Sequence, residues 1–509
     1  MVSGNSQRIA RNTIFLYIRT LFSQLIALYT SRKILEILGV EDYGIYNVVG
    51  GVVSMLTFFN GSMAVATQRF LTVELGRGDL EAYNRVFSMA YVIHIVLALL
   101  IVIGAESVGL WFLNTYLNIP YDRIVAANWV YQFSIFSVAV GIMQTPYMAS
   151  ITAHEHMDVY AYVGVGTSIL NLIVVFLLLV IDYDCLVVYA LLCFCIQLIV
   201  VYVYRFYVIR KFDECHFRYY WNVKLFRSML GFTGWNIFGT MAWILKDQGI
   251  NILMNIFGGA AVNAARGISF QILSAVQNLV SGFNTAVNPQ LTKNYASGNK
   301  ENLLRLMMTS SKISFFLLAL IAIPVLIEIE YILNLWLVNV PEHTVIFARI
   351  ILIEALCGVY SGPMVTSLMA TGNIKWYQIV VGSSMLFNVP FSYILLQLGY
   401  PIVAPLIVSI GIVIFSSVLR LLFCKYQLGL SVWSYVKKVI FPSIVVFILS
   451  SITPMVVSLF MSVGFMKLVT VTIISFISVS LFTYALGLNQ NERQLVRVSI
   501  NKFLNKISR

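Results

Sequence analysis

The chain has 509 residues, of which 60% are apolar and only 11% are charged, and its mean hydropathy is +0.87. A soluble chain of this length would carry about a quarter charged residues, so the composition excludes an ordinary soluble enzyme. The net charge of +12 does not indicate nucleic-acid binding, because the basic residues lie in short segments between apolar runs and not on one soluble face.

Apolar runs long enough to cross a bilayer recur along the whole chain. Arg19 interrupts the first run and no small-residue cleavage site follows it, so we predict a retained first helix and not a signal peptide. The expected fold is therefore an all-α polytopic membrane bundle. We predict fourteen spanning helices, at 13–35, 44–68, 86–113, 124–148, 158–181, 185–204, 229–255, 263–289, 306–327, 345–370, 376–398, 402–423, 439–461 and 466–487.

The distribution of Lys and Arg predicts the orientation of these helices. With the N-terminus inside, the cytoplasmic segments hold 25 of the 33 basic residues and the outer segments hold four. Because basic residues are retained on the cytoplasmic side of membranes, we predict that both termini are cytoplasmic. The longest cytoplasmic segment, 205–228, has about two dozen residues, so any working site is expected within the bundle.

The two halves of the chain show an internal repeat. A shift of 220 residues aligns Gly78 with Gly298, and a shift of 217 aligns Pro146 with Pro363. Because six helices separate the repeats, both halves enter the membrane in the same direction, and a pseudo-twofold axis along the membrane normal is expected. We predict an N-terminal lobe (1–205), a cytoplasmic linker (206–228), a C-terminal lobe (229–424), and an appended hairpin with a basic tail (425–509).

Three segments resemble polysaccharide exporters of the multidrug/oligosaccharidyl-lipid/polysaccharide (MOP) superfamily. These segments are R-K-I-L-E-I-L-G-V-E-D-Y-G-I-Y-N (residues 32–47), E-L-G-R-G-D (74–79) and A-T-G-N (370–373). The chain is most similar to Wzx-type O-antigen and capsule flippases, and more distantly to the lipid II flippase MurJ. The resemblance implies a bacterial inner-membrane protein that moves an undecaprenyl-pyrophosphate-linked oligosaccharide by alternating access through a cationic cavity. It also implies that helices 1, 2, 7 and 8 line that cavity.

Charged residues inside predicted spans are the first candidates for this cavity, because a charge in the bilayer usually faces water or a partner. Arg19, Lys246 and Arg266 are expected to bind the pyrophosphate, although Arg19 also has the alternative of reaching the inner headgroups. Asp247 and Glu354 are candidates for ion coupling, with a structural salt bridge, for example from Glu354 to Arg349, as the alternative.

Polar side chains are concentrated in the same four helices. Amides turned towards lipid would lack hydrogen-bond partners, so they are expected to line a polar cavity or, alternatively, to bond between helices. The predicted lining residues are Gln24, Asn47, Asn60, Gln68, Asn236, Asn251, Gln271 and Asn284.

Three other functions remain open beside the flippase. A drug or cation antiporter of the same superfamily is disfavoured because helix 1 carries no acidic residue. A membrane polysaccharide polymerase or ligase is disfavoured because the longest outer loop, 328–344, contains no Arg. The third is a transport-inactive scaffold for glycan assembly.

The sequence shows no metal-ligand spacing, so no metal and no cofactor are expected. The expected partners are the lipid-linked oligosaccharide, membrane lipids and possible glycan polymerase or assembly proteins, with the chain itself a monomer.

Overall fold

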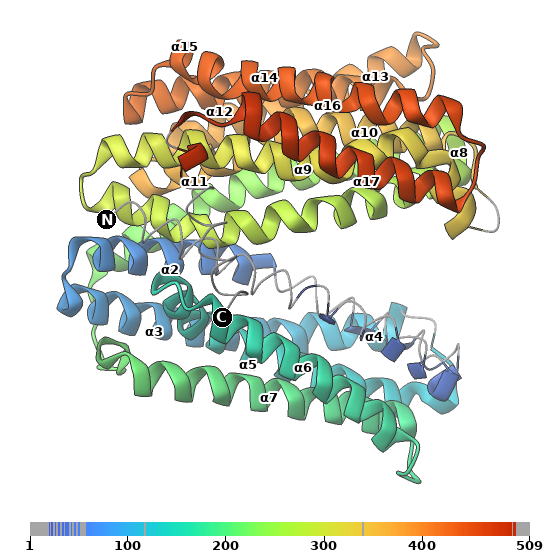
Figure 1. Cartoon of the computed structure of the whole chain (residues 1–509). Helices are drawn as coiled ribbons and strands as arrows, with labels where there is room; N and C mark the ends of the chain where they lie inside the picture. The colour runs from blue at the N-terminus through green and yellow to red at the C-terminus, as the bar shows by residue number, and fades with distance from the viewer. Residues whose placement is uncertain are drawn as a thin grey trace, which may run out of the picture. The chain divides into compact units, whose positions relative to one another are not determined.

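The computed structural model describes residues 58–116, 119–337, 340–490 and 492–494, together with single residues and short stretches between 20 and 50. All regular structure in these residues is helical (Figure 1). The chain divides into two compact units with the boundary between Gly234 and Trp235, an N-terminal unit before it and a C-terminal unit after it. Arg19, Gln24 and Asn47, with most of the predicted first span and part of the second, lie outside the described residues.

The N-terminal unit is a helix bundle in which α5 packs against α2, α3 and α7, and α6 packs against α7. A π-helical turn, η1, connects α3 directly to α4. The helices of this unit are α2 (Phe58–Arg77), α3 (Leu80–Gly104), η1 (Ala105–Gly109), α4 (Leu110–Tyr116), η2 (Tyr121–Arg123), α5 (Ile124–Ala153), α6 (Met157–Leu178), α7 (Cys185–Lys211) and η3 (Asp213–Cys215).

The C-terminal unit is built around α14, which packs against α10, α11, α12 and α13, and around α9, which packs against α10, α11, α16 and α17. The helices concerned are α8 (Val223–Ala296, which starts in the N-terminal unit), α9 (Lys300–Trp336), α10 (Thr344–Gly358), α11 (Ser361–Thr371), α12 (Lys375–Leu386), α13 (Asn388–Gln397), α14 (Ala404–Leu428), α15 (Val432–Tyr435), η4 (Val436–Ile440), α16 (Phe441–Phe460), α17 (Phe465–Phe482) and η5 (Thr483–Gly487).

The long helix α8 folds back on itself. Asp247 and Arg266 are 19 residues apart in sequence and form an ion pair. Along a straight helix they would be separated by about 28 Å. The chain therefore reverses between them, which agrees with a break between the predicted spans 229–255 and 263–289.

Nine helices of the described chain are long and apolar enough to span a membrane, and α10 with α11, bent by 44°, makes a tenth if counted as one span. Each overlaps a predicted span; the last, Phe465–Gly487, coincides with the predicted 466–487. Helix α8 is not among them because its amides and glycines lower its hydropathy. The total of fourteen spans and their orientation therefore remain predictions.

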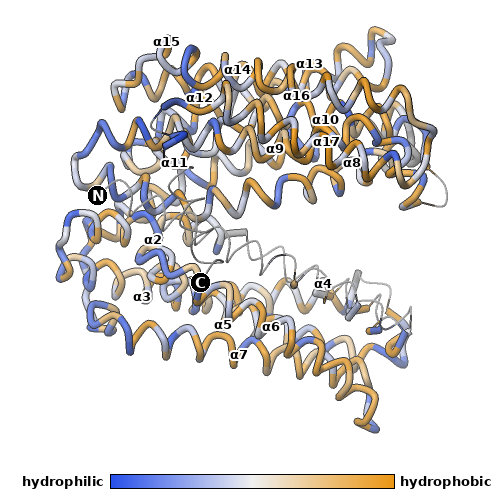
Figure 2. The backbone as a smooth tube through the Cα atoms, in the orientation of Figure 1, coloured by the Kyte–Doolittle hydropathy of each residue, from blue (hydrophilic) through white to orange (hydrophobic). Residues whose placement is uncertain are grey.

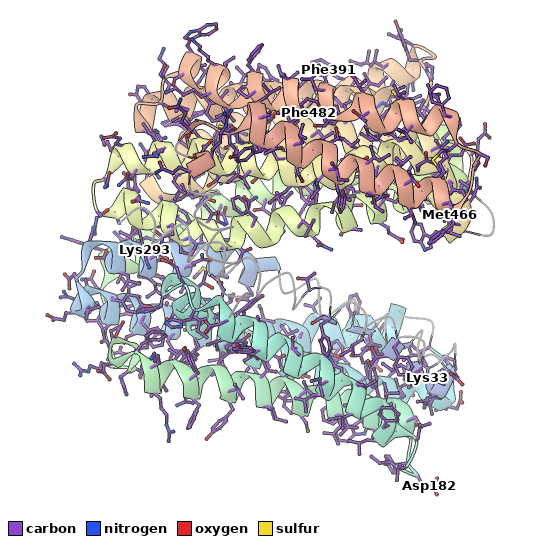
Figure 3. All side chains as sticks on the ribbon, in the orientation of Figure 1. Lys33, Asp182, Lys293, Phe391, Met466 and Phe482 are labelled. Carbon is purple, nitrogen blue, oxygen red and sulfur yellow. The ribbon has the colours of Figure 1, made fainter. Side chains whose placement is uncertain are left out.

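Apolar residues run along the helices and hydrophilic residues gather near several of their ends (Figure 2). Asp182 lies at the α6–α7 turn and Lys293 near the end of α8 (Figure 3). The apolar side chains of Phe391 and Met466 are exposed on α13 and α17. This pattern is typical of helices whose outer faces contact lipid.

The predicted repeat appears in the local geometry of two turns. Gly78 follows α2 with φ +78°, and Gly298 follows α8 with φ +75°. The residues after these glycines, Asp79 and Asn299, both cap the next helix through a side-chain oxygen. Glycine adopts this left-handed conformation without steric cost, which explains why it occupies both turns.

A second repeated feature lies around the aligned prolines. The Ser150 hydroxyl donates to the Pro146 carbonyl over 2.9 Å, and the Ser367 hydroxyl donates to the Pro363 carbonyl over 2.8 Å. In the turns that follow, Gly372 has φ +75°, and its counterpart under the 217-residue shift, Glu155, has φ +63°. The repeat therefore extends from residue identities to backbone conformation.

Arg123 joins three segments at one end of the N-terminal unit. Its guanidinium contacts Asp42 over 2.6 Å and Asp184 over 2.8 Å. Burial alone would raise the pKa of Asp184, but hydrogen bonds from Arg123 and from the backbone N–H groups of Val187 and Leu186 outweigh it and lower that pKa. The network stabilises the start of α7, where Asp184 is the N-cap.

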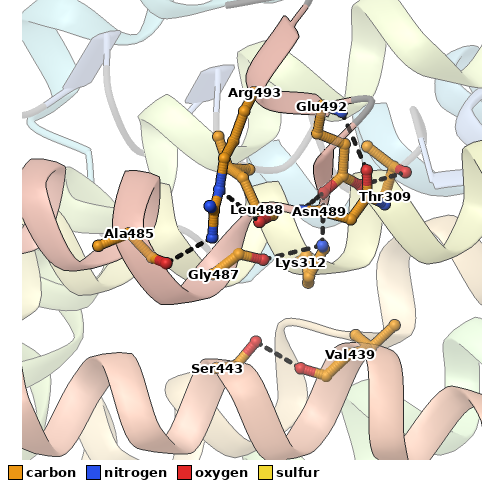
Figure 4. Close-up of polar contacts among 10 residues, drawn as sticks. All are labelled: Thr309, Lys312, Val439, Ser443, Ala485, Gly487, Leu488, Asn489, Glu492 and Arg493. Carbon is orange, nitrogen blue, oxygen red and sulfur yellow. Dashed lines mark hydrogen bonds and ion pairs between the residues drawn. The ribbon is translucent and has the colours of Figure 1, made fainter.

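A buried ion pair holds the segment after the last helix against α9 (Figure 4). Lys312 Nζ lies 2.7 Å from Glu492 Oε2 and 2.9 Å from the Gly487 carbonyl. The other carboxylate oxygen of Glu492 accepts from the Thr309 hydroxyl over 2.9 Å. The side chains of Lys312 and Glu492 are only 5% and 11% exposed. Lys312, which lies in the predicted span 306–327, is therefore part of the protein interior.

We predict that Glu492→Ala destabilises the C-terminal unit by about 3 kcal/mol, because it leaves the Lys312 ammonium buried without a counter-charge. The double variant Lys312→Met/Glu492→Ala should recover most of this loss. The measurement is unfolding in mixed micelles. The matched control is Glu74→Ala, which removes a pair whose Arg77 side chain is 58% exposed and should cost less than about 1 kcal/mol. A double variant no more stable than Glu492→Ala would contradict the prediction.

Candidate substrate cavity

A cavity of about 540 Å³ lies within the C-terminal unit. This volume falls within the roughly 300–1,000 Å³ typical of ligand sites. Its walls come from both arms of α8 and from α10, α11, α12 and α14. The polar and charged residues of its lining are Lys246, Asp247, Gln277, Ser281, Asn284, Thr285, Asn288, Glu354, Ser361, Ser416 and Arg420.

An ion pair joins the first arm of α8 to α10 in this cavity. Lys246 Nζ lies 2.7 Å from Glu354 Oε1, and the two side chains are 10% and 17% exposed. Both residues line the cavity. Glu354 therefore forms an ion pair with Lys246 and not with Arg349, which is exposed on α10.

A second ion pair joins the two arms of α8. Arg266 Nη2 lies 2.5 Å from Asp247 Oδ1 and also donates to the Asp247 carbonyl over 3.2 Å. The guanidinium carbon lies 4.5 Å from the ring centroid of Phe270. Asp247 and Phe270 line the cavity, whereas Arg266 does not. Lys246 and Asp247 thus point to different partners, because successive helix residues are rotated by about 100°.

Arg420 on α14 is the cation of the cavity that sequence reasoning missed. It lies near the end of the predicted span 402–423, is only 8% exposed, and lines the cavity. Its Nη1 donates a long 3.3 Å hydrogen bond to the Ser361 hydroxyl. Within the described residues no carboxylate forms an ion pair with it, and its buried Nε has no acceptor.

Amide side chains of the second arm of α8 form the polar floor of the cavity. Asn284 accepts from the Ser314 hydroxyl over 3.0 Å, and Asn288 accepts from the Thr366 hydroxyl over 2.9 Å. Gly362 lies against Asn284, where a Cβ would come within 2.8 Å of the amide nitrogen. These amides are thus positioned by neighbouring helices and still face the cavity.

The other predicted lining residues are distributed more widely. Asn236 is buried against Gln378, Asn251 is half-buried and Gln271 is exposed, and none of the three lines the cavity. Asn60 and Gln68 lie in the N-terminal unit, where Asn60 accepts from Thr145 and the Gln68 carbonyl accepts from Thr72. Interhelical or local bonding, the alternative stated above, accounts for Asn60 and Asn236.

Among the residues that the structure describes, no cluster of His, Cys, Asp and Glu has the geometry of a metal site.

Residues 248–394, from α8 into α13, match the MatE family. No curated protein matches the sequence. Among solved structures, a MATE protein in a bent conformation is 13% identical with a TM-score of 0.72, covering 84% of this chain and 96% of that chain. The MATE transporter ClbM in complex with Rb⁺ is 16% identical with a TM-score of 0.71, covering 85% and 96%. A MOP superfamily transporter from Pyrococcus furiosus is 12% identical with a TM-score of 0.70, covering 84% and 96%.

These likenesses show that the chain is a multi-pass membrane protein with the MATE fold. This fold agrees with the predicted resemblance to the MOP superfamily, because the similar structures include a MATE transporter and a MOP superfamily transporter. The narrower likeness to O-antigen and capsule flippases remains a prediction.

We predict that the Lys246–Glu354 pair behaves as a unit in stability. Lys246→Met should cost about 3 kcal/mol because Glu354 is left buried and charged, and Lys246→Met/Glu354→Met should recover most of that loss. Unfolding of the purified variants measures this. Arg349→Met, on the same helix as Glu354 and exposed, is the control and should change stability by less than about 0.5 kcal/mol. Additive losses in the double variant would rule out direct coupling.

Proposed function

We propose that this chain is a transporter whose cavity takes a polar, anionic cargo, and that the cargo is an undecaprenyl-pyrophosphate-linked oligosaccharide. The observation that carries the proposal is the charge of the cavity. Lys246, Arg266 and Arg420 line it or contact its lining, against the two carboxylates of Asp247 and Glu354. The surplus of one positive charge, in a site that membrane helices surround, favours an anion.

The uncharged lining supports a sugar-bearing cargo. Amides and hydroxyls from Gln277, Ser281, Asn284, Thr285 and Asn288 face the cavity along one arm of α8. Sugar hydroxyls both donate and accept hydrogen bonds, and so do these side chains. An apolar drug would leave many of these groups without partners, which costs binding free energy.

Cation antiport is the second candidate, and the comparisons favour it. The similar solved structures include MATE transporters, one of them in complex with Rb⁺. Asp247 and Glu354 line the cavity and are carboxylates that a cation or proton would require. Against this, each is engaged by a basic side chain at 2.5–2.7 Å, so a cation would have to displace that side chain.

We predict that the purified chain in proteoliposomes translocates a fluorescent undecaprenyl-pyrophosphate sugar and does not exchange a labelled organic cation against sodium or protons. Translocation is read from the accessibility of the sugar to a membrane-impermeant reagent, with empty liposomes as the control. Cation exchange without lipid translocation would establish the antiporter and reject the flippase.

The same assay tests ion coupling. If Glu354 or Asp247 carries the coupling ion, translocation by the wild type should respond to a proton or sodium gradient, and Glu354→Gln or Asp247→Asn should remove that response. Translocation that ignores every gradient would eliminate coupling through these carboxylates.

A further inference from the structure

We infer that Arg420, with the hydroxyls of Ser361 and Tyr377, forms a binding site for a phosphate oxyanion on the inner part of the cavity. The inference rests on the proposed function and deepens it, because it assigns the anionic group of the cargo to one place. It also moves that place away from Lys246 and Arg266, which sequence reasoning favoured.

The state of Arg420 distinguishes it from the other cations of the cavity. Lys246 and Arg266 are each held by a carboxylate, so a ligand anion must first displace Glu354 or Asp247. Arg420 is equally buried, at 8% exposed, and none of the described carboxylates pairs with it. A buried charge without a counter-ion is costly, and a ligand anion relieves that cost.

The hydrogen-bonding capacity of Arg420 is also unfilled. The guanidinium has five N–H donors, and its bond from Nη1 to Ser361 Oγ is long at 3.3 Å. The Nε lies buried with no acceptor in the part of the chain that the structure describes. An arginine in this state presents the fork of donors that grips phosphate oxygens in pairs.

Neighbouring hydroxyls complete the site. Ser361 lies at the start of α11, lines the cavity, and also lies 3.3 Å from the Ser417 hydroxyl. Tyr377 on α12 is 3% exposed, and its hydroxyl interacts with Arg420. These hydroxyls come from two helices that pack against α14, so the three donors are fixed relative to one another.

The position of Arg420 suits a cargo that enters from the inner leaflet. Arg420 lies in the last third of α14, and the predicted topology places the end of this helix on the cytoplasmic side. The paired residues Lys246 and Glu354 lie nearer the predicted outer ends of their helices. A lipid pyrophosphate or a free phosphate from the cytoplasm would therefore meet Arg420 first.

The test is binding of inorganic pyrophosphate to the purified full-length chain by calorimetry. Arg420→Gln should weaken binding by about tenfold or more, the size expected for one charged hydrogen-bonding partner. Arg420→Lys should weaken it less, and Ser361→Ala should weaken it by a few-fold. Arg349→Gln, which makes the same charge change at an exposed position on α10, should bind as the wild type does.

Equal pyrophosphate binding by the wild type and Arg420→Gln would overturn the site, and so would a wild type that binds neither pyrophosphate nor a polyprenyl pyrophosphate. Retained melting temperature and the partial rescue by lysine separate loss of the site from loss of the fold. A second arm distinguishes the source of the phosphate by adding polyprenyl pyrophosphate in nanodiscs as a competitor. Competition supports the lipid-linked cargo. If pyrophosphate binding depends on Arg420 but polyprenyl pyrophosphate does not compete with it, the anion site is supported and the proposed lipid-linked cargo is rejected.

Discussion

The cost of an uncompensated charge in a low-dielectric interior organises this structure. Three buried cations of the C-terminal unit, Lys246, Arg266 and Lys312, each contact a carboxylate at 2.5–2.7 Å. These pairs join the two arms of α8 to each other, the first arm of α8 to α10, and the C-terminal segment to α9. Breaking such a pair leaves a buried charge without a counter-charge, which is energetically costly. The pairs therefore favour the packing of these segments against one another. Arg420 is the exception in the described cavity, and an exception of this kind is most readily explained by a ligand.

The repeat allows the two halves of the chain to be compared position by position. The two halves share turn geometry at Gly78 and Gly298, and the proline-centred bond from Ser150 and Ser367. With the same shift of 217, α14 aligns with α7, and Arg420 corresponds to Val203, which is 40% exposed. The scaffold of the described residues is therefore repeated, while the cation at this position of the repeat belongs to the C-terminal half.

Several elements were predictable because they depend on local sequence. The apolar run at 466–487 coincides with the last helix, and the interruption of α8 follows from its polar and glycine-rich middle. The run at 345–370 also becomes helical, but the structure bends it by 44° between α10 and α11. Hydropathy reports the length of a helix and not its straightness, so the apolar run alone does not show this bend.

The sequence by itself determined the class of this protein: an all-α membrane bundle with an internal repeat and polar residues concentrated in a few helices. The length of the apolar runs and the glycines at turns are enough to predict this class, because each feature depends only on residues that are close together in the sequence. Only the tertiary structure decided the partners of the charges. Glu354 meets Lys246 across 108 residues and Lys312 meets Glu492 across 180, distances over which no sequence pattern specifies contact. The same holds for Arg420, whose partners the sequence does not reveal although it lies in the predicted span 402–423. The packing of α11 and α12 against α14 buries Arg420 and places it at the centre of the proposed site.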